Sequence, residues 1–94
     1  MSLERLHAQA YGEVQGVGFR RFVVDEAHRL KVAGWVRNRW DDSVEVMAEG
    51  ERAYLGRLLE SLRRGPSRAE VETVTEEWLP ATGEFKQFWV LPTD

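Results

Sequence analysis

Residues 12–21 read GEVQGVGFRR, and this segment most constrains what the chain can fold into. Before it, the apolar residues Leu6, Ala8 and Ala10 alternate with polar ones, which is the period of a half-buried strand. After it, apolar residues recur from Phe19 at the spacing of an amphipathic helix. Three glycines within seven residues therefore predict a tight turn from a strand into a helix. Two arginines follow that turn directly.

The same two periods predict the elements of the remaining chain. Apolar residues at helical spacing predict a first helix with Phe19, Phe22, Val23, Ala27 and Leu30 and a second with Leu55, Leu58, Leu59 and Leu62. Strands are predicted at 33–38, at 44–49 after a turn through Asp41 and Asp42, around 69–78 and roughly at 85–91. Gly65-Pro66 predicts the end of the second helix, and a register shift over 71–74 indicates a β-bulge. Asp25 and Arg29 are spaced as an i, i+4 ion pair.

The order of these elements predicts the fold class. It reads β-α-β-β-α-β with an additional C-terminal strand, which is typical of an α+β ferredoxin-like sandwich. In that architecture two helices cover one face of an antiparallel sheet. No repeat, linker or low-complexity tract divides the sequence, so we expect a single domain over residues 1–94. This fold carries many unrelated activities and leaves the function open.

Composition and charge exclude several classes of function. The chain has no cysteine, which rules out disulfides, thiolate catalysis and cysteine-ligated metals. It has a net charge of -3, which argues against binding nucleic acid by bulk attraction. The charge is uneven, because residues 1–40 carry +3 and residues 41–94 carry -6. The glycine-rich segment lies in the basic part, which favours a small anion as its partner. No apolar run has the length of a signal peptide or a membrane span, so we expect a cytoplasmic protein.

The glycine-rich segment has two interpretations. Gly12, Gly16 and Gly18 permit left-handed backbone and let N–H groups approach a ligand, and the following helix adds its partial positive charge. Together with Arg20 this would make a phosphate site. The alternative is an ordinary tight turn with Arg20 on the surface. The segment lacks the third glycine of a dinucleotide fingerprint and the Lys-Ser/Thr pair of a P-loop.

Two motifs resemble the acylphosphatase family. Tyr11-Gly12-Glu13-Val14-Gln15-Gly16-Val17-Gly18-Phe19-Arg20 is similar to its first signature, and Gly34-Trp35-Val36-Arg37-Asn38, with Val44 and Gly50 following, is similar to its second. Both occur in the family's order, and the resemblance covers nearly the whole chain. Two positions depart from the family pattern. Ala10 stands where Val, Ile or Leu is usual, and Asp42 stands where a turn glycine is usual, for which we expect left-handed backbone or a different turn type.

The resemblance implies an activity and its residues. Acylphosphatases hydrolyse the carboxyl-phosphate bond of acyl phosphates, without a metal, a cofactor or a covalent nucleophile. Arg20 and Asn38 are the implied catalytic residues, with Asn38 orienting the attacking water. The implied substrate-binding residues, which hold the phosphoryl group through backbone N–H groups and the Arg20 guanidinium, are Gln15, Gly16, Val17, Gly18, Phe19 and Arg20. A small-molecule substrate and a monomer without nucleic-acid or membrane partners are expected.

Other residues and functions remain as alternatives. Arg21, Arg37 and Arg39 lie near the implied site in sequence, although surface arginines are common. His7 and His28 lack partners at ligand spacing, which argues against a metal. The aromatic residues Trp35, Trp40, Trp78, Trp89, Phe85 and Phe88 are expected in the core rather than stacked on RNA bases. One alternative function is a non-catalytic acylphosphatase-like module that binds carbamoyl phosphate or another phosphorylated metabolite. The other is a ferredoxin-like RNA-binding domain, which the missing RNP motif disfavours.

Overall fold

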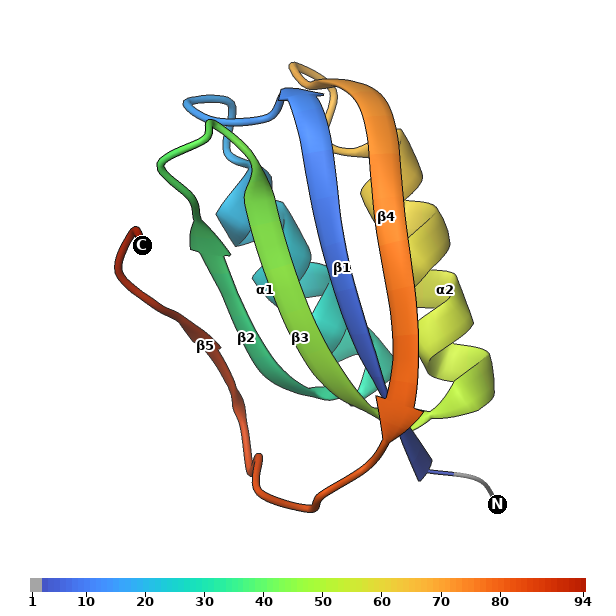
Figure 1. Cartoon of the computed structure of the whole chain (residues 1–94). Helices are drawn as coiled ribbons and strands as arrows, with labels where there is room; N and C mark the ends of the chain where they lie inside the picture. The colour runs from blue at the N-terminus through green and yellow to red at the C-terminus, as the bar shows by residue number, and fades with distance from the viewer. Residues whose placement is uncertain (1–2) are drawn as a thin grey trace.

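A computed structural model describes residues 3–94 of the chain. Its elements follow in the order β1 (Leu3–Glu13), α1 (Phe19–Leu30), β2 (Ala33–Asn38), β3 (Val44–Glu51), α2 (Arg52–Arg64), β4 (Glu70–Pro80) and β5 (Phe88–Val90). Figure 1 shows the strands as one curved sheet with both helices against the same face. The α+β ferredoxin-like sandwich expected from the pattern is therefore confirmed.

The sheet has the strand order β4-β1-β3-β2-β5. The β1–β3, β1–β4 and β2–β3 pairs are antiparallel, as expected. The expectation of a wholly antiparallel sheet is wrong at one edge, because β5 runs parallel to β2. The segment between Pro80 and Phe88 returns along the end of the sheet before β5 begins, which gives β5 the direction of β2 (Figure 1). The sheet is therefore mixed.

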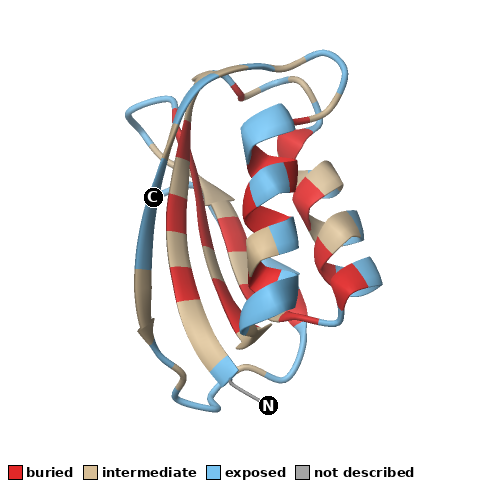
Figure 2. Ribbon diagram, turned by 90° about the vertical axis from the view of Figure 1, so that its right-hand side faces the viewer, coloured by how far each residue is buried: buried red, intermediate tan, exposed pale blue. Residues whose placement is uncertain are grey.

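The core lies between the sheet and the two helices. Figure 2 shows buried stripes on both helices facing the strands, and exposed residues on their outer sides. The stripes are Phe19, Val23, Ala27 and Leu30 on α1 and Leu55, Leu58, Leu59 and Leu62 on α2. They pack against Leu6, Ala8, Ala10, Val36, Val44, Val46 and Ala48 from β1, β2 and β3. Burying apolar area at roughly 25 cal/mol per Å² stabilises this arrangement of layers.

The structure tests three local predictions, which concern the β-bulge, the backbone at Asp42 and the Asp25–Arg29 ion pair. The register of β4 against β1 shifts where Gly12 pairs with Val71 and Tyr11 with Thr73, so Glu72 is the extra residue of the predicted bulge. Asp42 has left-handed backbone, with a φ of 72°. The prediction of an Asp25–Arg29 ion pair is wrong, because Asp25 pairs with Arg21 instead.

The expectation that the aromatic residues lie in the core is wrong for two tryptophans. Trp40 is 81% exposed and Trp89 is 55% exposed, whereas Phe88 is buried. Trp40 lies in the turn between β2 and β3, and Trp89 lies on the edge strand β5. A turn and a sheet edge each have few neighbours with which to cover a large ring.

Candidate active site

The loop between β1 and α1 is held at three points. Val14 and Phe19, at its two ends, are almost completely buried. Between them, the Gln15 side-chain amide donates to the carbonyl oxygens of Arg39 and Ser43, at 2.9 Å each. Those carbonyls belong to the turn between β2 and β3, which lies beside the loop in Figure 1. The glycine loop (residues 14–18) is therefore fixed to the core and to the neighbouring turn.

The backbone of the glycine loop alternates in handedness. Gly16 has a φ of 73° and Gly18 a φ of 80°, while Val17 between them is not left-handed. Alternation of this kind turns successive N–H groups toward one side and makes a concave anion site. A Cβ on either glycine would meet no atom within 4 Å, so the requirement for glycine here is the backbone angle. The loop has the geometry of a nest for an anion.

The start of α1 adds positive potential to the same place. Gly18 is the N-cap, no side chain caps the helix, and the first turn contains no acidic residue. The N–H groups of that turn therefore stay available, and they carry the partial positive charge of the helix. Arg20 in this turn contributes a full charge. Within residues 3–94, no carboxylate lies at ion-pair distance from its guanidinium.

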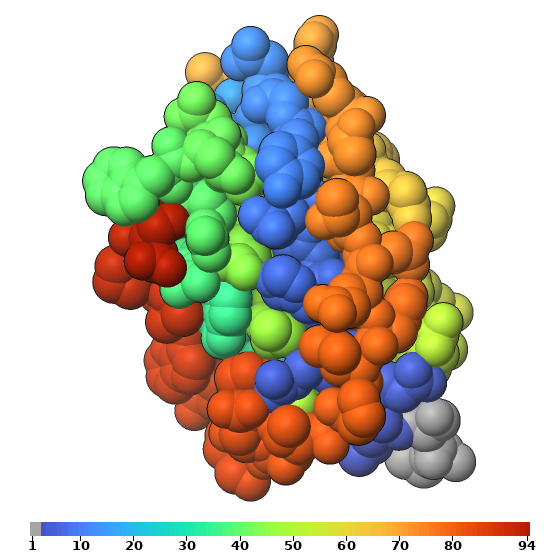
Figure 3. Space-filling model, viewed as in Figure 1, coloured from blue at the N-terminus to red at the C-terminus, as the bar shows by residue number. Residues whose placement is uncertain are grey.

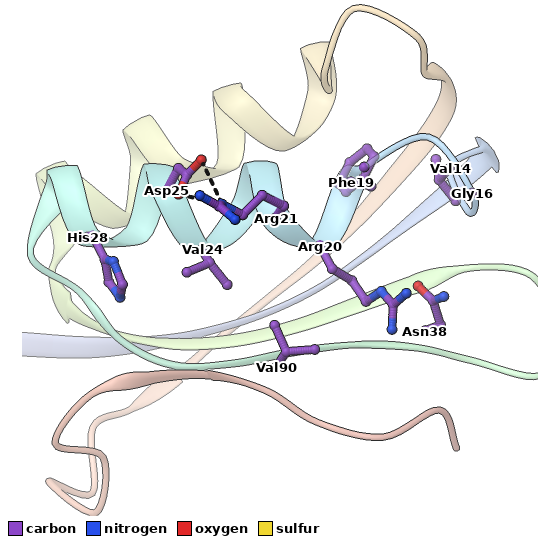
Figure 4. Close-up of a pocket in the computed structure, with 11 residues that line it drawn as sticks. Val14, Gly16, Phe19, Arg20, Arg21, Val24, Asp25, His28, Asn38 and Val90 are labelled. Atoms are coloured by element: carbon purple, nitrogen blue, oxygen red, sulfur yellow. Dashed lines mark hydrogen bonds and ion pairs between the residues drawn. The ribbon is translucent and has the colours of Figure 1, made fainter.

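Asn38 forms the opposite wall of the site. It is the last residue of β2, paired with Val44 of β3, and its carbonyl oxygen accepts a 3.1 Å hydrogen bond from the N–H of Asp94. These contacts fix the backbone from which the Asn38 side chain extends. Among the described residues, the Asn38 carboxamide has no hydrogen-bond partner. Figure 4 shows it beside the end of the Arg20 side chain, with both groups directed into the same pocket.

The pocket has a volume of about 620 Å³ and gathers most of the implied site. Of the residues implied by the motifs, Gly16, Gly18, Phe19, Arg20 and Asn38 line it. Gln15 and Val17 do not, because the Gln15 side chain is bonded to the β2–β3 turn and Val17 packs against the core. The pocket also has lining residues that the sequence did not suggest, namely Val14, Val24, Asp25, His28 and Val90. Arg21, which lies near the implied site in sequence, lines the pocket as well.

For two of these additional lining residues, the sequence does contain a signal, which is their helical spacing from Arg20. Val24 and His28 follow Arg20 at intervals of four, which places all three on one side of α1. Arg21, which is 83% exposed, forms a 3.2 Å ion pair with Asp25 at the rim of the pocket (Figure 4). Val90 comes from β5, and no motif in the sequence indicates it.

Arg37 and Arg39 do not line the pocket. Their partner Glu45 alternates along β3 with the core residues Val44 and Val46, so it lies on the helix-free face of the sheet, which faces the viewer in Figure 3. Both arginines donate to the buried carboxylate of Glu45, at 2.8 Å and 2.9 Å, and His7 lies 2.6 Å from its other oxygen. Burial alone would raise the pKa of Glu45, but these three hydrogen bonds outweigh it and lower the pKa to about 2. Arg37 also pairs with Asp94 at 3.3 Å. The two arginines therefore connect the C-terminal end of β2, which carries Asn38, to β3.

Among residues 3–94, no group of three or more histidine or carboxylate side chains is arranged to hold a metal ion. In the same part of the chain, neither helix has the length and hydropathy needed to cross a membrane.

Comparison with known proteins identifies the family. The sequence model described as Acylphosphatase matches residues 6–90. The chain belongs to the acylphosphatase family. A relative named acylphosphatase from Salinibacter ruber (strain DSM 13855 / M31) is 47% identical, over 93% of this chain and 92% of its own. An acylphosphatase from Pyrobaculum aerophilum is 45% identical over 99% of both chains.

Solved acylphosphatase structures agree with the fold. The crystal structure of acylphosphatase from Bacillus subtilis is similar with a TM-score of 0.90 and 35% identity, covering 95% of this chain and 98% of that one. These comparisons give no support to the alternative of a non-catalytic module. In this acylphosphatase-family chain, the two motifs thus lie on facing walls of one pocket, with the first motif supplying the glycine loop and Arg20 and the second supplying Asn38.

Proposed function

We propose that this protein hydrolyses acyl phosphates to a carboxylate and inorganic phosphate. The observation that carries the proposal is the convergence of three groups in one pocket: the glycine loop, the guanidinium of Arg20 and the carboxamide of Asn38. Among residues 3–94, the guanidinium has no ion-pair partner and the carboxamide has no hydrogen-bond partner. The loop and Arg20 bind the phosphoryl group. Asn38 orients the attacking water. The family assignment supports the same reaction.

Electrostatics favours a dianion at this position. A pair of unit charges about 4 Å apart interacts by roughly 4 kcal/mol at an effective dielectric of 20. Arg20 adds to this a planar pair of donors that matches two phosphoryl oxygens. The N–H groups of residues 15–20 surround the remaining oxygens, and because they are already in place, charge that develops on the phosphoryl oxygens needs no reorganisation of the loop.

The chemistry of the leaving group explains how so small a site suffices. The water oxygen forms a bond to phosphorus, the bond from phosphorus to the acyl oxygen breaks, and the carboxylate departs with the electron pair. A carboxylate needs no proton to leave near neutral pH, so no general acid is required. The Asn38 amide cannot accept the proton of the water and only orients it. That proton passes to an oxygen of the phosphoryl group, and the site supplies position and charge.

The test is phosphate release from acetyl phosphate and benzoyl phosphate, measured with and without EDTA. We expect turnover by the wild type that the chelator leaves unchanged. The Arg20→Gln variant should lose about a thousandfold in kcat/KM, by analogy with losing a donor to developing charge, and should bind inorganic phosphate more weakly. Arg57→Gln, an exposed arginine on α2 outside the pocket, is the matched control and should retain activity. Intact acyl phosphate with pure wild-type protein, or undisturbed phosphate inhibition in Arg20→Gln, would refute the proposal.

The proposal includes the setting of the reaction. We infer a cytoplasmic monomer whose partner is the small substrate alone, with neither nucleic acid nor membrane. The net charge of -3 supports this, because it repels polyanions and anionic lipid surfaces. Sedimentation equilibrium at micromolar concentration should give the mass of one 10.9 kDa chain.

A further inference from the structure

The pocket is longer than a phosphoryl group requires. Beyond the glycine loop it continues between α1 and β5, where Val24, His28 and Val90 line it. Arg20, Val24 and His28 lie on one side of the helix, and eight residues at a rise of 1.5 Å extend over about 12 Å. Figure 4 shows Val24 and Val90 facing each other across this extension, with His28 at its far end. Part of the pocket therefore remains when phosphate occupies the loop.

In-line displacement determines which part of the substrate enters the extension. The attacking and leaving oxygens lie on opposite sides of phosphorus. In Figure 4, Asn38 lies on one side of the Arg20 guanidinium, and Val24 and Val90 lie on the other. If the water is held by Asn38, the acyl oxygen leaves toward the two valines. The acyl group is then directed along the extension.

The surface of the extension is apolar where the acyl group would lie. Val24 packs partly against the core, and Val90 is 50% exposed, so both present methyl groups to the pocket. Two charged side chains of the lining, Arg21 and Asp25, are ion-paired with each other at the rim. Backbone bonds hold β5 in place, since it pairs in register with β2 and the N–H of Leu91 donates to the carbonyl of Val36 at 2.9 Å.

We propose that Val24 and Val90 form an acyl-binding subsite, which makes acyl phosphates with extended apolar acyl groups the preferred substrates. The proposal rests on the proposed function and specifies its substrate class. The acyl chain lies between α1 and β5 and covers the two valines, and His28 limits its length. Acetyl phosphate occupies the glycine loop but is too short to cover both valines.

A series of straight-chain substrates tests the subsite. Acetyl, butanoyl and hexanoyl phosphate have leaving groups of nearly the same acidity, so differences in kcat/KM report binding of the chain. For the wild type, the ratio of hexanoyl to acetyl kcat/KM should exceed one. Val24→Ser and Val90→Ser should each lower that ratio roughly three- to tenfold, less than a methylene is worth in a closed pocket. Val90→Leu should preserve or raise it. Leu3→Ser, at an exposed apolar residue on β1 outside the pocket, should leave it unchanged.

The outcomes separate this proposal from the proposed function. Hydrolysis of all three phosphates with the same ratio in the wild type and both serine variants overturns the subsite and leaves the reaction standing. No hydrolysis of any of them by the wild type overturns the reaction and the subsite with it. Val90 is half-exposed, so Val90→Ser should fold, and circular dichroism checks this directly. A lowered ratio in a folded Val90→Ser variant supports the subsite even if Val24→Ser is unstable.

Discussion

The side-chain amide of Gln15 donates a 2.9 Å hydrogen bond to the backbone carbonyl of Arg39, the residue that directly follows Asn38. A second bond of equal length runs from the same amide to the carbonyl of Ser43. One side chain thus joins the loop that forms one wall of the pocket to the turn that adjoins the other. The position of the glycine loop relative to Asn38 depends on this connection, and so does the distance between the proposed phosphate site and the amide proposed to orient water.

Gln15→Ala should therefore impair catalysis although it removes no group that lines the pocket. It removes one of two hydrogen bonds at each carbonyl, since the N–H of Asp42 still donates to Arg39 and the N–H of Arg39 to Ser43. The loss costs about 0.5–1.5 kcal/mol of stability per bond, and it frees the glycine loop from the turn. We expect KM for acetyl phosphate to rise several-fold, with kcat reduced as well. Gln87→Ala, an exposed amide that does not line the pocket, is the control. Unchanged kinetics in a folded Gln15→Ala variant would show that the connection is not needed.

Asn38→Ala should lower kcat by roughly two to three orders of magnitude, by analogy with the loss of a single donor at an oxyanion site. KM should change little, because Arg20 and the loop still bind the phosphoryl group. The backbone bonds of Asn38 are retained in this variant, and urea unfolding should confirm near-normal stability. A large rise in KM with normal kcat would instead assign Asn38 to substrate binding.

Alanine at Gly18 and at Gly56 should have opposite effects on stability. Gly18 is held at a φ of 80°, and a Cβ there would meet no atom, so Gly18→Ala costs only the left-handed backbone, about 1–2 kcal/mol. Gly56 lies inside α2 with normal helical backbone and open space around it. Gly56→Ala should stabilise the protein by about 0.5–1 kcal/mol. Urea midpoints for the two variants check the pair, and a stable Gly18→Ala would contradict the nest geometry.

Glu45 should make stability depend on pH in the acid range. Its pKa in the folded state is about 2, below its ordinary value of 4.5, so the carboxylate stabilises the fold above pH 4.5 and loses this contribution as the pH falls from 4.5 toward 2. The shift corresponds to roughly 3 kcal/mol. The groups that face it are His7, Arg37 and Arg39.

Glu45→Gln should accordingly be less stable than the wild type at pH 7, and the difference should shrink toward pH 2. Free energies of unfolding at pH 7, 5, 4 and 3 measure it. Glu60→Gln on α2 is the control, since that carboxylate is 74% exposed and its pair with Arg63 contributes less than about 1 kcal/mol. A gap between the wild type and Glu45→Gln that is constant with pH would rule out this account.

The sequence predicted those parts of the fold that depend on neighbouring residues. The leucine stripe of α2, its end at Gly65 and the bulge near Glu72 all follow from local spacing. The parallel direction of β5 does not, because it depends on the path of residues 81–87 around the sheet. Glu45 alternates with apolar residues like a solvent-facing strand residue. Its burial results from contacts with His7 on β1, Arg37 on β2 and Arg39 in the β2–β3 turn, which alternation along β3 does not reveal.

The candidate site was predictable where it depends on the two motifs, and not where it depends on contacts between distant segments. Arg20 and Asn38 stand in motifs 18 positions apart in sequence, and the resemblance implied that both serve one site. The structure places them in one pocket. Val90 was not predictable, since its place in the pocket depends on the unexpected pairing of β5. The destination of the Gln15 side chain also depends on a contact across 24 positions, between a loop and a turn.

The glycine loop leaves the sheet from β1, and β1 is bonded along both sides, to β3 and to β4. Local unfolding therefore starts most easily at the short edge strand β5. It reaches β1, the strand that leads into the glycine loop, last. Warming should fray the periphery while the binding loop keeps its shape. Hydrolysis of acetyl phosphate and the native state should then disappear in one cooperative step.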